Sequence, residues 1–227
     1  MANGDPMQDP NVRRLVGMAQ AGAPPNYRLR YKHFALWDTR RYTTAGTTLT
    51  AGDHNFFRNP QGSQTADGFT TKTYAETNLE KAGSLPDEVN CLVDRISVEI
   101  FPNGLFAATV VPANYKDLTA LMRQGVVYFE SGDYKAYLGP LTMFPAGGGP
   151  LVWTDGSNAT AVSASANNGV PAPSAERQLV EPIAIRGGQS FKFVMFVGAA
   201  ITLADGTNGL DVRVRLGGRQ VVRAVDG

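Results

Sequence analysis

Residues 179–197 read LVEPIAIRGGQSFKFVMFV and contain two apolar runs separated by a glycine pair. In the first run Leu179, Ile183 and Ile185 share one parity, which is the period of a strand with one buried face. The second run is apolar at consecutive positions, so we expect a strand that is covered on both sides. Its two faces would be Phe191, Phe193, Met195 and Val197, and Val194 with Phe196.

The residues between the two runs predict how these strands are joined. Gly187 and Gly188 can take positive φ angles without steric cost, so we expect a tight hairpin between two paired antiparallel strands. Pro182 has no N–H to donate to a neighbouring strand, which favours an edge position or a bulge for the first strand. The stretch therefore predicts a hairpin at the centre of an antiparallel β protein.

The composition agrees with many short strands. The chain has 227 residues with 25 glycines and 14 prolines, and 43% of its residues are hydrophobic. This hydrophobic fraction is sufficient for a sizeable core, and β-sandwiches of roughly 200–250 residues commonly form one domain. The net charge of +1 gives no general argument for nucleic acid or an acidic substrate. Basic residues in the first sixty positions favour either a basic arm toward phosphate or lipid head groups, or ordinary solvated charge.

The N-terminal region predicts an arm over residues 1–26. Asp9 is a plausible helix cap, Pro10 suits the first helical position, and apolar residues follow at helical spacing. Such a short helix must dock on its own domain, on a neighbouring subunit or on a membrane. We expect residues 27–227 to form the main domain, with an exposed, mobile loop at about 147–175. No apolar run is long enough for a membrane span or a signal core, which predicts a product made in a cytoplasm.

Alternation and turn residues predict the remaining elements. We expect one well-defined helix that Asn114 caps and Gly125 ends, with Leu118, Leu121 and Met122 on its apolar face. The expected strands are 27–37, 69–74, 92–101 paired through a turn with 105–111, 126–130, 134–138, 141–144, and 211–216 followed by a Gly217-Gly218 turn and a last strand.

No catalytic motif stands out in the sequence. The only two histidines are His33, expected on a strand, and His54, expected in a turn; a metal site from both plus a carboxylate is a minor alternative. Cys91 excludes an intrachain disulfide and is expected to be a buried small hydrophobe, without a histidine partner. The run Gly147–Gly149 lacks the Lys-Ser/Thr of a phosphate-binding loop. We therefore predict no catalytic, cofactor-binding or metal-binding residues, no cofactor and no enzyme activity.

Two weaker patterns leave alternatives open. The carboxylates of Asp87 with Glu88, or of Asp53 with Asp67, could act as an acid–base pair in a β-sandwich enzyme, although solvated turn residues are the favoured interpretation. Aromatic side chains could stack on sugars, Trp153 beside the long loop in particular; the candidates are Trp37, Trp153, Tyr134 and Tyr137. The glycosylation sequon at Asn158 is treated as a coincidence of composition.

Several stretches resemble the jelly-roll coat proteins of tailless icosahedral bacteriophages. They are TNLEKAGSLP before a long strand, ATVVPANYKDLTALMRQGVVYF, PLTMFPAGGG, and LVEPIAIRGGQSFKFVMFV before the final DVRVRL. The resemblance is one of strand pattern over about residues 27–225. It implies an all-β antiparallel sandwich with a single jelly roll, one inserted short helix and an N-terminal arm.

The resemblance also implies a function. It implies a structural subunit that self-associates into an icosahedral phage capsid, in the virion, with copies of itself and minor virion proteins as partners. In many relatives the shell encloses an internal lipid membrane, and no sequence-specific nucleic acid binding is expected. Two other classes remain open: a carbohydrate- or receptor-binding β-sandwich of a virion spike or similar structure, and a β-sandwich enzyme.

Overall fold

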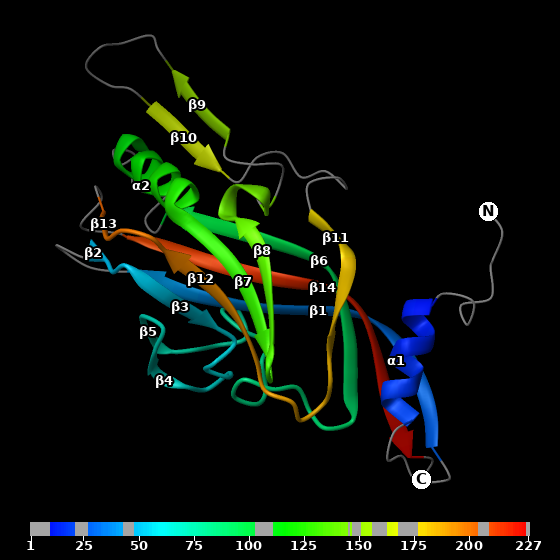
Figure 1. Ribbon diagram of the computed structural model, residues 1–227. Helices are drawn as coiled ribbons and strands as arrows, with labels where there is room; N and C mark the ends of the chain where they lie inside the picture. Colours follow the sequence, from blue (N-terminus) through cyan, green and yellow to red (C-terminus); the bar gives the residue numbers. More distant parts are fainter. Residues whose placement is uncertain are drawn as a thin grey trace.

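The computed structural model describes residues 10–20, 27–42, 48–102, 111–144, 146, 151–155, 163–167, 177–203 and 209–225. Within these residues the chain is mostly β, with antiparallel sheets and two α-helices (Figure 1). The all-β antiparallel class expected from alternation and turn residues is confirmed at this level.

Eight of the strands form two four-stranded antiparallel sheets. The first sheet has the order β1 (Tyr27–Tyr42), β14 (Leu210–Val225), β6 (Val89–Pro102) and β11 (Arg177–Ile185). The second sheet has the order β3 (Gly52–Phe56), β12 (Phe191–Val197), β7 (Gly125–Ser131) and β8 (Tyr134–Pro140). Three small two-stranded sheets are β2 (Thr48–Leu49) with β13 (Ile201–Thr202), β4 (Gln64–Ala66) with β5 (Phe69–Thr71), and β9 (Leu151–Asp155) with β10 (Ser163–Asn167).

One hydrophobic core contains residues from both four-stranded sheets. Val98 of β6 and Val212 of β14 face it from the first sheet, and Phe193 of β12 faces it from the second. Figure 1 shows β7, β8 and β12 passing across β6, β14 and β1. Helix α2 (Val111–Gln124) covers one end of the core, where Leu118, Leu121 and Met122 are buried as expected. It begins at Val111, before the expected cap at Asn114, and ends before Gly125 as expected.

Helix α1 (Pro10–Gln20) packs on the outer face of the first sheet. Leu15 contacts Leu92 of β6 and Val221 of β14, and all three side chains are buried. Leu92 lies between Cys91 and Val93, which face the core, so alternation places Leu92 on the opposite surface. Of the three surfaces on which the sequence allowed this helix to dock, the structure shows that of its own domain.

The prediction of a hairpin at residues 179–197 is wrong, although both of its strands are present. Strand β11 pairs with β6 in the first sheet, whereas β12 pairs with β3 and β7 in the second. The Arg186–Gln189 turn therefore joins two sheets, and the strands that flank it are not neighbours in a ladder. Pro182 does lie on an edge strand, within an irregular register between Gln178 and Ile183, as expected.

The glycine pair at 217–218 is not a turn. Strand β14 continues through it, with a register shift against β6 at this point. A Cβ atom at Gly218 would lie 1.9 Å from the Leu92 carbonyl oxygen, so glycine permits a close approach of two backbones at a bulge. The sequence pattern alone does not separate a bulge from a turn.

Three other expectations need correction or remain outside the described residues. The expected strand at 141–144 is the short 3-10 helix η2 (Leu141–Met143). The expected partner strand 105–111 lies mostly outside the described residues, and β6 pairs with β14 and β11. Within the expected loop at 147–175 the structure instead gives the paired strands β9 and β10; the rest of that loop is outside the described residues.

Candidate functional site

The most concentrated polar chemistry lies beneath residues 57–79, which we name segment 57–79. This segment contains the β4–β5 hairpin, whose two-residue turn is Asp67-Gly68. Both turn residues have positive φ angles, 53° and 83°, the backbone shape that Asp-Gly favours in tight hairpins. The Arg41 N–H donates to the Asp67 carbonyl at 2.8 Å, and a Cβ at Gly68 would lie 2.2 Å from the Arg41 carbonyl oxygen. The hairpin is therefore held directly against the backbone of β1.

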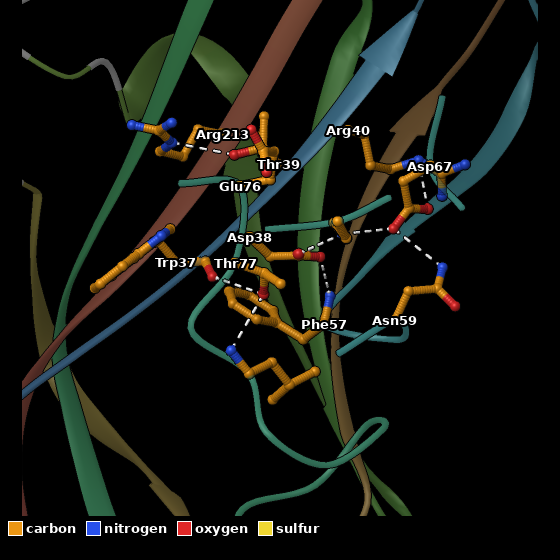
Figure 2. Close-up of polar contacts among 12 residues, drawn as sticks. Trp37, Asp38, Thr39, Arg40, Phe57, Asn59, Asp67, Glu76, Thr77 and Arg213 are labelled. Atoms are coloured by element: carbon orange, nitrogen blue, oxygen red, sulfur yellow. Dashed lines mark hydrogen bonds and ion pairs between the residues drawn. The ribbon is translucent and has the colours of Figure 1, made fainter. Parts of the chain in front are cut away.

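A second set of contacts fixes the end of the segment to the edge of β1. The Asn78 side chain accepts from the Trp37 N–H at 2.9 Å and donates to the Ala35 carbonyl at 2.8 Å. Thr77 donates through its hydroxyl to the Trp37 carbonyl at 3.1 Å (Figure 2). Strand β1 is an edge strand of the first sheet, so these contacts cover backbone groups that would otherwise be open to pairing.

A buried lysine lies between two aspartates in the space that the segment closes. The Lys72 Nζ is 2.5 Å from Asp38 Oδ1 and 2.6 Å from Asp67 Oδ2. The side chains of Lys72 and Asp38 have no exposed surface, and that of Asp67 is 4% exposed. Asp38 projects inward because it shares the parity of Phe34 and Leu36, which face the core. We name Asp38, Asn59, Asp67, Lys72 and Arg40 the buried charge cluster.

Other groups donate hydrogen bonds to the two carboxyl groups or form ion pairs with them. The Phe57 N–H donates to Asp38 Oδ2 at 2.6 Å, and the Asn59 side-chain amide donates to Asp67 Oδ2 at 3.0 Å (Figure 2). Arg40 Nε lies 3.5 Å from Asp67 Oδ1. Two acids thus face two basic side chains, which is the condition under which charges can be buried at acceptable cost.

The electrostatics of the cluster differ between its two acids. Desolvation raises the pKa of Asp38 above its ordinary value, and the opposing effect of the adjacent Lys72 ammonium does not cancel it. Asp67 instead receives the additional contacts of Asn59 and Arg40. Burial thus favours the protonated form of Asp38.

The cluster can act on the chain itself. It places an amine, two carboxyl groups and a backbone N–H within hydrogen-bonding distance, away from water. The reacting atoms of Lys72 and Asp38 have no exposed surface, so a dissolved substrate does not reach them in this arrangement.

A second candidate region is the outer face of the second sheet. Phe196 lies opposite Val126, and Tyr128 lies opposite Tyr137. Phe196 is 41% exposed, Val126 40% and Tyr137 76%, so apolar surface is open on neighbouring strands. Phe196 was expected to be covered, whereas Val194 on the same face is buried. We name Asp53, Val126, Tyr128, Lys135, Tyr137 and Phe196 the aromatic face.

Polar contacts hold the aromatic face in place. The Tyr128 hydroxyl donates to Asp53 Oδ2 at 2.7 Å, and burial, followed by this bond, raises the pKa of Tyr128. Lys135 Nζ lies 3.8 Å from the centre of the Tyr128 ring, and the rings of Tyr128 and Tyr137 are 6.0 Å apart. These contacts hold Tyr128 beside exposed apolar side chains, and a contiguous exposed apolar patch is a property of surfaces that bind other molecules.

The two histidines do not form a site together. His33 is exposed on β1, and His54 is buried in β3, where a strand replaces the expected turn. The His54 Nε2 is 2.9 Å from the Thr50 carbonyl oxygen, and its ring packs edge-on against Tyr42. Among the residues that the structure describes, no group of three or more histidine, cysteine or acidic side chains could hold a metal ion.

The remaining sequence candidates are dispersed. Cys91 is buried in the core as expected, and burial raises the pKa of its thiol. Asp87 and Glu88 are exposed, and Asp53 and Asp67 make separate contacts in the aromatic face and the buried charge cluster.

The aromatic candidates are dispersed as well. Trp37 is half-buried against Tyr74, and Trp153 lies on strand β9. The glycines at 147–149 and Asn158 are outside the described residues.

The buried charge cluster was missed as a site in the sequence. The available signals were the Asp67-Gly68 dipeptide and a single lysine within the Thr-rich run TTKTY at 70–74. The dipeptide predicts a hairpin, but neither signal predicts that Lys72 meets Asp38.

No described helix is long and apolar enough to cross a membrane. The chain matches no family model, no curated protein and no solved structure.

Proposed function

We propose that this chain is a structural subunit that self-associates into an icosahedral phage capsid, with a single jelly roll as its main domain. The observation that carries the proposal is the pairing order of the eight strands in the two four-stranded sheets. In chain order, the first pairs with the last, the second with the seventh, the third with the sixth and the fourth with the fifth; the pairs are β1–β14, β3–β12, β6–β11 and β7–β8.

This nested order has a simple geometric meaning. Eight strands paired in this way form one long antiparallel hairpin, and rolling that hairpin up brings alternate pairs together. The first and third pairs then join through β14 and β6, and the second and fourth pairs join through β12 and β7. Two four-stranded sheets that share a core are the product, which supports the jelly-roll architecture common in viral coats and lectins.

A jelly roll occurs both in coat proteins and in sugar-binding proteins, so the fold alone does not identify the function. The exposed surface provides the further evidence. The aromatic face exposes Phe196, Val126 and Tyr137 on neighbouring strands, which suits burial against another protein surface. Helix α1 already packs on the outer face of the first sheet, so the second sheet offers the more open apolar surface. A repeated subunit contact is the use of this surface that agrees with the proposed shell.

The proposed setting is the virion. The partners would be copies of this chain and minor virion proteins, with an internal lipid membrane as a further neighbour and without sequence-specific nucleic acid binding. The basic residues of the arm, Arg13 and Arg14 on α1, are the groups that would meet an anionic surface.

The test is the mass of the purified protein by light scattering, with negative-stain microscopy of the same fractions. Closed shells or symmetric capsomers support the proposal, and a strict monomer at high concentration contradicts it. Phe196→Arg places a charge in the aromatic face and is expected to abolish the higher-mass species. Thr71→Arg, at an exposed position of strand β5, is the matched control that retains them.

A carbohydrate- or receptor-binding module is the second candidate. Tyr134 is 56% exposed and lines a pocket of about 360 Å³ with Arg14 and Arg186. Glu181 also lines this pocket, and an exposed aromatic ring beside charged groups of both signs suits a sugar. A glycan array decides this candidate: binding that Tyr134→Ser removes supports it, and an array without binders counts against it.

A further inference from the structure

We propose that Lys72 and Asp38 condense into an intramolecular isopeptide bond after folding, with Asp67 as the group that transfers the proton. This inference goes beyond the proposed function and does not depend on it. It assigns a covalent cross-link between β1 and segment 57–79, and the two joined residues are 34 positions apart in sequence.

Proximity is the first requirement, and the fold provides it. The Lys72 Nζ lies 2.5 Å from Asp38 Oδ1, and neither side chain has exposed surface. Holding an amine and a carboxyl group in contact removes most of the entropic cost of joining them. A buried site also excludes the water that would hydrolyse the reaction intermediate.

Protonation state is the second requirement, because the reaction needs a neutral amine and a protonated carboxyl group. A charge loses its hydration in a dry site, which disfavours the ionised form of a buried carboxyl group. Desolvation raises the pKa of Asp38, which agrees with the electrophile being this carboxyl group. The Asp67 Oδ2 lies 2.6 Å from the Lys72 Nζ and also accepts a hydrogen bond from the Asn59 amide, so this carboxyl group is placed to accept the proton.

A backbone donor polarises the carboxyl group that is attacked. The Phe57 N–H donates to Asp38 Oδ2 at 2.6 Å, and this oxygen gains negative charge when the amine adds to the carbon. Phe57 has a positive φ angle of 63°, a conformation that a bulky residue rarely takes. The strained backbone thus aims an N–H at the oxygen where charge develops.

The atoms balance without any external reagent. The Lys72 nitrogen lone pair forms a C–N bond to the Asp38 carboxyl carbon, and Asp67 Oδ2 accepts a proton from that nitrogen. The bond from this carbon to Oδ1 then breaks, Asp67 returns the proton to the leaving oxygen, and one water molecule departs. Oδ2 stays as the amide oxygen, hydrogen-bonded to Phe57, and Asp67 is regenerated.

The experiment is intact mass spectrometry of the denatured full-length protein, followed by peptide mapping. The folded protein is expected to weigh one water molecule less than its sequence requires. A branched peptide should join Lys72 to Asp38, and trypsin should not cleave after Lys72. An unmodified mass in folded protein after prolonged incubation at neutral pH overturns the proposal.

Variants separate this bond from other losses of water. Lys72→Arg and Asp38→Ala should restore the full mass that their sequences require. Asp38→Asn should still react, losing ammonia in place of water, and give a product with the mass of the wild-type product. A succinimide at Asp67-Gly68 also loses water, but it gives no branched peptide, and finding it alone overturns the proposal.

The role of Asp67 needs a variant that keeps the fold. Asp67→Asn retains shape and hydrogen-bonding capacity and should leave the protein uncondensed, although its circular dichroism matches that of the wild type. The exposed ion pair of Lys81 and Asp87, 3.4 Å apart, is the matched control. Lys81→Arg should retain the wild-type loss of water, and a folded Asp67→Asn protein that condenses at the wild-type rate contradicts the assignment of Asp67.

Discussion

Two buried regions of this molecule are held together by different physics. The core between the two four-stranded sheets is lined by apolar side chains such as Val98, Val212 and Phe193. The space beneath segment 57–79 contains Lys72 and Asp38, which are equally buried and carry ionisable groups. Apolar packing needs the correct volume, whereas a buried charge needs specific partners at specific atoms. The core therefore tolerates exchange of similar residues, and the buried charge cluster depends on each of its members.

A change in the core is expected to have the largest effect on stability. Phe193→Ala removes a fully buried ring that packs against Phe56, and we expect a loss of about 4 kcal/mol in the free energy of unfolding. Phe196→Ala, three residues further on the same strand and 41% exposed, should lose about 1 kcal/mol or less. Urea denaturation measures both, and equal losses would contradict the assignment of the two faces of β12.

The buried charge cluster provides the next largest effect. Lys72→Ala removes the buried side chain that contacts both Asp38 and Asp67 and leaves the two acids without this partner, and we expect a loss of about 3 kcal/mol or more. Lys81→Ala breaks an exposed pair with Asp87 and should cost less than about 1 kcal/mol. Thermal and urea unfolding of the two variants can be compared directly. A Lys72 variant as stable as the Lys81 variant would show that the charges beneath segment 57–79 contribute little.

The two histidines also differ in burial, and this difference predicts a dependence of stability on pH. Burial lowers the pKa of His54 below its ordinary value of 6.5, so the folded state takes up this proton at lower pH than the unfolded state does. The folded state thus binds fewer protons, and its free energy of unfolding falls as the pH drops from about 7 to 5. His54→Gln should flatten that decline in urea titrations at each pH. His33→Gln, at the exposed histidine, is the control, and a decline that survives His54→Gln would contradict this origin.

Much of the secondary structure follows from local signals. Alternation predicts β6 and the C-terminal strand, and the apolar face of α2 with Gly125 after it predicts that helix and its end. The two short strands at 126–130 and 134–138 are β7 and β8, joined as a hairpin. These features depend on residues within a few positions of one another, so the sequence contains the information directly.

Pairing across the chain is where local signals fail. The glycines at 187–188 and 217–218 look alike in sequence, yet the first pair turns the chain between sheets and the second lies in a bulge. The difference comes from Leu92 and Asp87, whose backbones approach the two glycine pairs and are distant in sequence. Lys72 is a similar case, because Asp38 becomes its partner only after β1 and segment 57–79 meet. Tertiary contacts decide these positions.

The pairing of β1 with β14 has a consequence for synthesis of the protein. Arg41 and Asp211 are paired residues in adjacent strands and form a side-chain hydrogen bond, although they are 170 positions apart in sequence. A ribosome adds about 5–20 residues each second, so β1 waits several seconds or more for its partner. During that time the edge of β1 is open to any other strand, including one on a neighbouring nascent chain. Slow translation or a bound chaperone would therefore matter more to the yield of this chain than to that of a helical protein of the same size.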